Sequence, residues 1–464
     1  MLAMRSPLFK SRLLSGWVQA ALLASPSVQA LDLLQTWEQA RAYDPQMQVV
    51  AATRSSVQAY EAQAQALWRP VLMGSATVGA MSADTRTTGA QFAVGGQPSM
   101  PGSFATSASA ATSTRWSLQA KQPLYNPERQ AQQAQLNSAA GVAELRADLA
   151  QQQFMLLTAQ RYFNLLLAER QQHVLKNQYL AVSRSLTEAQ DRFALGDVPV
   201  TDTHEASARA AGLQAQLLAA DNDVQMARRV LIDSTRLSAD VLQPKPLKAQ
   251  VTVSALPSLE QVLTQVQQAN TGVLLKKVQS DVARQELKKH AQNGGVTLDL
   301  VASAGRDRLS GDGDFGASSN KQSQQMVGLS LNVPLYTGGW RSAKLQEAAG
   351  AASQAQAEVD MALQQSQQQA RTVWLALQTG PARLSAMQAA WNASTARLDA
   401  TRLGRQVGDR TTLELLQAQN DAAQAELSWL RAQTEVLMAR LQLDALTGNL
   451  SVQSLETLNT QLLP

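Results

Sequence analysis

The side chains most often used in catalysis are sparse and scattered in this sequence. It contains three histidines, His173, His204 and His290, and no cysteine among its 464 residues. Disulfides, thiolate metal sites, cysteine nucleophiles and an amino-terminal acyl-cysteine anchor are therefore not expected. His204 is followed by Glu205 but lacks the second histidine of a zinc-protease motif, so it is better interpreted as a helix-surface histidine. We predict no catalytic residue, no metal site and no cofactor.

Two further patterns bear on chemistry. The sequence has no G-x-x-x-x-G-K-[ST] motif, so we expect any energy source to lie in a partner protein. The run Gly311-Asp312-Gly313-Asp314 carries carboxylates that could coordinate calcium, but its spacing fits no EF-hand loop. A flexible surface loop is the better interpretation of this run.

Residues 1–30 have the pattern of a cleavable signal peptide. A basic start is followed by an apolar stretch from Leu13 to Ala24 and by the small-residue end Val28-Gln29-Ala30. Removing the three basic residues of this leader would lower the formal net charge from +4 to +1, so no nucleic-acid partner is expected. No later stretch reaches the ~20 apolar residues of a transmembrane helix. If the exported chain enters a membrane, it must do so as a β-barrel.

The chain consists of two similar halves. A Pro-Leu-Tyr segment at Pro123 recurs at Pro334, an offset of 211 residues, and a Gly-Asp pair at Gly196 recurs at Gly408, an offset of 212 residues. A repeat of this length predicts a duplicated architecture whose halves pack side by side. The predicted repeats are residues 31–245 and 246–464.

Period-2 alternation of apolar and polar residues predicts β-strands with one lipid-facing and one polar face. The predicted strands are residues 71–80, 115–121, 296–303 and 327–333. The edge strand of a soluble sheet would show a similar pattern in any single segment. Each pair brackets a polar segment, residues 81–114 or 305–325, which we expect to be a long loop. Pro123 and Pro334 should end the strands, because proline has no N–H to donate.

Four strands cannot close a barrel, since about eight are needed. We therefore expect the protomer to oligomerise, and three copies would supply twelve strands. Aromatic residues at the expected boundary between strands and helices would form a belt at the membrane interface. The predicted belt residues are Trp68, Tyr125, Tyr336 and Trp340.

Two unusually long helical segments follow the strand pairs. The segment from Pro127 to about Leu195 contains no later proline and would run roughly 100 Å as one helix. The matching segment, from Gly339 to about Gly404, is interrupted at Gly380-Pro381, where we expect a kink. Heptad spacing in both segments predicts helix-on-helix packing. A filamentous coiled coil would explain the heptads but not the leader or the strands.

These features together resemble the TolC family of outer-membrane factors, over nearly all of the chain after the leader. The resemblance rests on the duplicated strand–loop–strand–Pro-Leu-Tyr–long-helix unit and on two helix–turn–helix tips, near residues 196–202 and 404–414. The tip turns contain Gly196, Asp197, Gly408 and Asp409. The resemblance implies a mainly α fold with a small β-barrel part: a trimeric α/β barrel, or channel-tunnel, with four transmembrane strands per protomer. It would lie in the outer membrane and extend into the periplasm.

By the same resemblance, polar links between neighbouring coils at the tips form a periplasmic gate. Carried over by position, Asp202 should face Arg405, and Thr201 should face Arg410. The best-known members have a tyrosine where this chain has Arg405, so a hydrogen bond would become a charge-assisted pair.

The resemblance also implies acidic rings at the constriction near the second tip. Glu414 matches the first ring, whereas Gln417 occupies the second, which would therefore lack its charge. Three Glu414 carboxylates around a threefold axis would repel one another and attract cations. We expect weaker cation block than in members with two acidic rings.

The resemblance implies a homotrimer in contact with outer-membrane lipid, acting as the exit duct of a type I secretion system. Its partners would be a periplasmic adaptor, an inner-membrane ABC transporter and an exported protein cargo, possible examples being toxins such as cyclolysin. The absence of a lipid-bearing cysteine favours this secretion branch. The alternatives are a duct for small-molecule efflux with a proton-driven pump, and a periplasmic coiled-coil scaffold without a channel.

Overall fold

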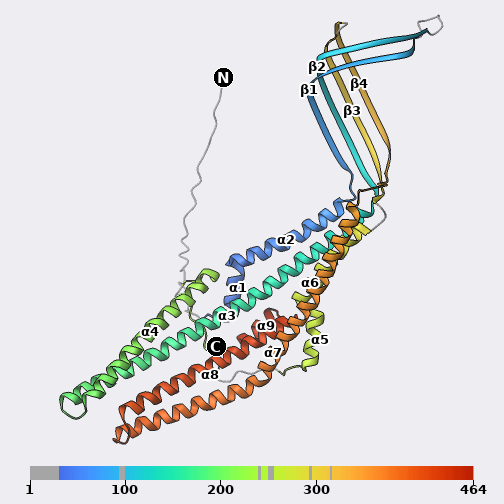
Figure 1. Cartoon of the computed structure of the whole chain (residues 1–464). Coiled ribbons are helices and arrows are strands. Elements are labelled where there is room, and N and C mark those ends of the chain that lie inside the picture. The colour runs from blue at the N-terminus through green and yellow to red at the C-terminus, as the bar shows by residue number, and fades with distance from the viewer. Residues whose placement is uncertain are drawn as a thin grey trace, which may run out of the picture.

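The computed structural model describes residues 31–92, 100–238, 242–248, 255–291, 295–313 and 316–462. The predicted signal peptide, residues 1–30, lies outside the described residues, and so does Asp314. Figure 1 shows an elongated molecule, with a long β-sheet at one end and the turns of two long helix pairs at the other.

The helices and strands occur in the same order twice. The first half contains α1 (Leu33–Tyr43), α2 (Pro45–Ala66), β1 (Val71–Phe92), β2 (Met100–Tyr125), α3 (Pro127–Ala194) and α4 (Val200–Thr235). The second half contains α5 (Leu259–Ala269), α6 (Thr271–Ala291), β3 (Thr297–Gly313), β4 (Gly316–Asn332), α7 (Trp340–Gln406) and α8 (Thr412–Leu446), followed by α9 (Val452–Asn459). The predicted fold class, duplicated long helices with a small curled sheet, is confirmed. The expected boundary at residues 245 and 246 falls between α4 and α5.

In the described part of the chain the sheet is antiparallel and has the order β1-β2-β3-β4. Its strands are 22, 26, 17 and 17 residues long, well beyond the predicted bounds. The prediction of loops is therefore wrong for the described residues 81–92, 100–114, 305–313 and 316–325. Hydrogen bonds to the neighbouring strand hold these polar stretches extended, and hydrophobic alternation does not report such pairing.

The expected role of the two prolines holds only in the second half. β4 ends at Asn332, before Pro334. Pro123 instead lies inside β2 and pairs with Asp299, and the strand continues after a register irregularity to Tyr125. A proline can occupy such an irregular position because its carbonyl group still accepts a hydrogen bond.

The long helices are continuous. α3 has 68 residues and begins with Pro127, whose missing N–H is not needed in the first turn. α7 has 67 residues and runs through Pro381 without a break in the helix, and its axis changes direction along its length (Figure 1). The kink expected at Gly380-Pro381 stays a prediction. A Cβ atom on Gly380 would lie 2.9 Å from Val436 Cγ2. The glycine therefore allows α7 to approach α8 closely.

The apolar core lies in the middle of the molecule, where α1, α9 and α5 cover the long helices. Its largest cluster includes Trp37, Phe154, Tyr162, Phe163 and Leu441. The Tyr162 hydroxyl donates to the Leu31 carbonyl oxygen at 3.1 Å, and burial raises its pKa above the ordinary value for tyrosine. Because α3 packs on α4 and α7 on α8, both helix pairs project from this core towards the tips (Figure 1).

Candidate functional site: the helical tips

The two helix pairs end in turns of the same geometry. Gly196 and Gly408 have φ angles of 81° and 86°, which a residue with a Cβ atom rarely adopts. The N–H groups of Asp197 and Asp409 each donate to the carbonyl group five residues earlier, at 2.8 Å. Both bonds are those of a Schellman motif, in which glycine ends a helix. The repeated Gly-Asp pair of the sequence therefore marks two equivalent turns.

At the second tip, α8 begins with a capping box. The Thr411 hydroxyl accepts from the Glu414 N–H at 3.2 Å, and Glu414 Oε2 accepts from the Thr411 N–H at 2.8 Å. Arg410 Nη1 donates to Glu414 Oε1 at 3.0 Å. The Thr411 N–H, Arg410 and the Thr411 hydroxyl together lower the pKa of Glu414. Within one protomer the pKa of Glu414 is therefore lowered, whereas three facing Glu414 carboxylates in a trimer would raise it. Gln417, one turn further along α8, is exposed.

The first tip lacks this arrangement. Pro199 precedes α4, and no side chain caps the helix. The Thr201 hydroxyl donates to Asp202 Oδ1 at 3.5 Å. Asp202 lies in the first turn, where a negative charge interacts favourably with the helix dipole.

An ion pair joins the two helix pairs just above the tips. Arg405 Nη2 of α7 donates to Glu188 Oε1 of α3 at 2.6 Å. The Arg405 side chain is only 14% exposed, whereas that of Glu188 is 50% exposed. Arg192 lies 3.9 Å from the same carboxylate oxygen. Sequence reasoning missed Glu188, because it has no counterpart near the second tip and no local pattern marks it.

A cleft of about 210 Å³ lies between the tips. Arg405, Glu188 and Arg192 line it together with Asp202 and Glu205. The structure therefore brings Asp202 and Arg405 to one cleft, where Arg405 contacts Glu188.

The hydroxyl of Thr201 and the guanidinium of Arg410 have other partners within one protomer, Asp202 and Glu414. The pairing of Asp202 with Arg405 and that of Thr201 with Arg410 stay predictions.

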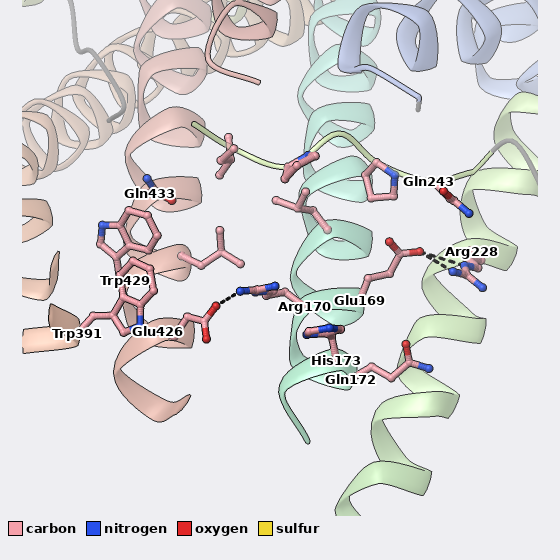
Figure 2. Close-up of a pocket in the computed structure, with 15 residues that line it drawn as sticks. Glu169, Arg170, Gln172, His173, Arg228, Gln243, Trp391, Glu426, Trp429 and Gln433 are labelled. Carbon is pink, nitrogen blue, oxygen red and sulfur yellow. Dashed lines mark hydrogen bonds and ion pairs between the residues drawn. The ribbon is translucent and has the colours of Figure 1, made fainter. Parts of the chain in front are cut away.

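A second ion pair between the helix pairs lies further from the tips. Arg170 of α3 pairs with Glu426 of α8 (Figure 2). On the other side of α3, Arg228 of α4 donates two hydrogen bonds to Glu169 Oε1, at 3.1 and 2.7 Å. Arg228 therefore holds the first helix pair together, whereas Arg170 joins it to the second.

A cavity of about 590 Å³ adjoins these ion pairs. On its α8 side, Trp391 and Trp429 stack with ring centroids 4.9 Å apart (Figure 2). His173 points into the same region from α3. The stacked indoles pack α7 against α8, and the Arg170–Glu426 ion pair beside this cavity joins α3 to the second helix pair.

The predicted belt residues lie where the sheet meets the helices. Tyr125 ends β2 and Trp340 begins α7, and their exposed fractions are 47% and 59%. Tyr336 is 89% exposed. Trp68 is half-buried and donates from Nε1 to Gln133 Oε1 at 3.0 Å.

The histidines lie on three different helices. His173 is on α3, His204 on α4, and His290 on α6, where its Nε2 lies 2.8 Å from Glu286 Oε1. Among the described residues no three histidine, aspartate or glutamate side chains are grouped so as to hold a metal ion. Each helix in this part of the chain is too short or too polar to span a membrane.

Comparison with known proteins identifies the family. The family model described as outer membrane efflux protein matches residues 36–235 and 262–449. The chain is 25% identical to outer membrane protein TolC of Vibrio cholerae serotype O1 over 97% of this chain and 98% of that protein. It is 26% identical to the proteases secretion protein PrtF of Dickeya chrysanthemi over 93% and 91% of the two chains.

The fold agrees with this assignment. The crystal structure of outer membrane protein VceC from Vibrio cholerae matches with a TM-score of 0.68 at 18% identity, over 90% of this chain and 96% of that chain. The protein lies in the outer membrane, and its helices extend into the periplasm. By sequence and by fold, this chain belongs to the outer membrane efflux protein family and is a TolC-type outer-membrane factor.

Proposed function

We propose that the chain is the outer-membrane exit duct of a type I protein secretion system. Its partners are a periplasmic adaptor, an inner-membrane ABC transporter and a secreted protein cargo. The observation that carries this proposal is the end-to-end similarity to PrtF, a protein named for protease secretion. The proposed cargo is a toxin-like protein, whereas PrtF itself is named for the secretion of proteases.

The duct is a homotrimer. In one protomer β1 and β4 each have one edge that no other described strand pairs. Unpaired backbone groups are costly in lipid, and a closed barrel removes them. Three copies joined edge to edge through β1 and β4 supply twelve strands, which is enough to close a barrel.

The tips form the periplasmic gate. Opening moves the α7–α8 pair away from the α3–α4 pair and therefore breaks the Arg405–Glu188 pair near the tips and the Arg170–Glu426 pair above it. Asp202, Thr201 and Arg410 supply further polar links in the closed trimer. These links and the ring positions Glu414 and Gln417 set the ion selectivity of the closed gate.

Transport through this duct involves no catalysis by the chain. The face of the sheet that carries Arg115, Asp307, Lys121 and Asp299 is polar and internally paired, with Arg115–Asp307 at 2.7 Å and Lys121–Asp299 at 2.9 Å. Such a surface is suited to line a wide aqueous passage. Energy for export comes from the inner-membrane transporter.

The alternative is small-molecule efflux with a proton-driven pump, which the description of the matching family favours. Culture-supernatant proteins should be compared by mass spectrometry between cells with the gene, without it, and with the gene restored. Loss of one secreted protein from the supernatant, with its retention in the cells, would support the secretion duct. An unchanged supernatant with increased sensitivity to toxic compounds would contradict secretion and support efflux.

A further inference from the structure

The strand register assigns every residue of the sheet to one of two faces. Paired residues on neighbouring antiparallel strands lie on the same face, and alternate residues along a strand share a face. Leu72, Ala120, Ala302 and Val327 form one such row across the sheet. Leu72 is 66% exposed and Val327 is 77% exposed, so this apolar face is the one that contacts lipid.

Two rows further along the strands, the lipid-facing side becomes basic. Trp116 pairs with Arg306, and in the next row on the same face Thr114 pairs with Arg308, which in turn pairs with Lys321. Rows of one face are about 6.8 Å apart and neighbouring strands about 4.8 Å apart. The backbones of Arg306, Arg308 and Lys321, which we call the basic cluster, therefore lie within about two strand spacings of one another.

The basic cluster has no counter-charge on its own face. All three side chains are exposed, and no hydrogen bond or ion pair joins any of them to another described residue. Asp307 points to the opposite face, where it pairs with Arg115. The acidic residue next along the same face of β3 is Asp312, about 13 Å beyond Arg308 along the strand.

The two faces of the sheet therefore differ in how their charged side chains are paired. On the polar face, the described residues form two ion pairs between oppositely charged side chains, Arg115–Asp307 and Lys121–Asp299. On the lipid face two cations, Arg308 and Lys321, stand directly opposite each other, an arrangement that destabilises a sheet by repulsion. An anion bound between them would remove this cost.

The position of the cluster identifies the kind of anion. The helices join the other end of the sheet (Figure 1) and extend into the periplasm, so the hairpin ends point out of the cell. The cluster lies towards those ends, at the level of Trp116 and Val78, which are 49% and 72% exposed. Tryptophan marks the membrane interface in barrels. The cations therefore lie at the outer edge of the apolar rows, at the headgroup level of the outer leaflet.

We propose that Arg306, Arg308 and Lys321 form a binding site for the phosphate groups of an anionic amphiphile of the outer leaflet. Its acyl chains lie along the apolar rows below the cluster, over Leu118, Leu72 and Val327. Arginine binds phosphate through two parallel N–H donors, and the opposed lysine supplies a further charge. This site fixes the depth of the barrel in the membrane and is independent of what the duct exports.

The test uses the purified full-length trimer in detergent, with bound lipid measured by native mass spectrometry. The probes are hexa-acyl lipid A with two phosphates, the same lipid dephosphorylated, and inorganic phosphate. The test variant is R306Q/R308Q/K321Q. The control is R115Q/D307N, which removes charges of β2 and β3 at the same level of the sheet but from the polar face. R306K/R308K retains the charge, and size-exclusion chromatography verifies that each variant is a trimer.

We expect the wild type to bind phosphorylated lipid A at least about tenfold more tightly than the triple variant does. The control should bind nearly as the wild type does, and the lysine variant should bind with an affinity between those of the wild type and the triple variant, because lysine keeps the charge but not the two parallel donors. Equal binding by the wild type and a trimeric triple variant would overturn the site. Equal binding of the dephosphorylated lipid would overturn the phosphate contact, and tight binding of inorganic phosphate alone would overturn the assignment to a lipid.

Discussion

The two tips share one turn but begin the following helix in different ways. Gly196 and Gly408 end α3 and α7 with the same left-handed conformation. α4 then begins at Pro199 without a side-chain cap, whereas α8 begins with the Thr411–Glu414 capping box and the Arg410 contact. The duplicated part is therefore the backbone geometry of the turn, whereas the side-chain cap belongs, of the two tips, to the second alone. Both turns must reverse the direction of the chain, but the helices that follow them carry different charged residues, Asp202 in α4 and Glu414 with Arg410 at α8.

The largest effect should come from the feature that the tips share. Gly196→Ala and Gly408→Ala should each destabilise the protein by about 1–2 kcal/mol, because the left-handed conformation is strained for a residue with a Cβ atom. No atom lies within 4 Å of the added Cβ at either site, so the two costs should be equal. Denaturant unfolding of the purified trimer measures both. A clear inequality would show that the turns are not equivalent.

The next largest effect on stability should differ between the two tips. Thr411→Ala removes the cap of α8 and should cost about 1 kcal/mol. Thr201→Ala is the matched control, since Thr201 caps no helix, and it should change the free energy of unfolding far less. Hydrogen exchange of the first turns of α4 and α8 locates the change. A larger increase in exchange in α4 than in α8 after Thr411→Ala would contradict the assignment of the cap.

A smaller effect is expected where the helix pairs meet. Arg405→Gln should raise the ratio of open to closed channels by about fivefold at most, or about 1 kcal/mol, because Glu188 is half-exposed and water screens the pair. Arg192→Gln, which affects a 3.9 Å contact to the same carboxylate, should do less. Single-channel conductance in planar bilayers measures both. Recovery of the closed state in R405E/E188R would confirm the pair, and no recovery would argue against it.

The smallest effect concerns pH and arises from Glu414 at the second tip. Because the pKa of Glu414 is lowered in the folded protein, its contribution is present above the unfolded pKa of about 4.3 and is lost as the pH falls through the lower folded value. Acid should therefore loosen the start of α8, as the pH falls from about 4.3 through the lower folded pKa of Glu414. Hydrogen exchange from pH 6 to about pH 3 measures this. E414Q should abolish this loosening, and its persistence in that variant would assign it to another group.

Local patterns predicted those parts of the fold that depend on neighbouring residues. The absence of proline after Pro127 predicted a helix as long as α3, and the repeated Gly-Asp pairs predicted both tip turns. The strands were placed correctly but made too short, because residues such as Ser113 and Ser319 are held by pairing partners that hydrophobic alternation does not reveal. Gly380-Pro381 predicted a weak point in α7, but the helix is continuous there, and Gly380 lies close to Val436 of α8.

The candidate gate was likewise predictable from the sequence only in part. Its location at the tips followed from the turns and from the family resemblance. The partner of Arg405 did not, because Glu188 is 217 residues away in the sequence and on the other helix pair. The basic cluster likewise required the register, since Arg308 and Lys321 are opposed only once β3 and β4 are aligned.

The sequence by itself therefore determined the duplicated order of elements, the positions of the turns and the apolar face of each strand. These features depend on backbone preferences and side-chain periodicity, which act over a few residues. Only the tertiary structure decided which charges meet, as Arg170 and Glu426 do across 256 residues. Such contacts depend on how two helix pairs or two strands are placed side by side, and no local preference specifies that placement.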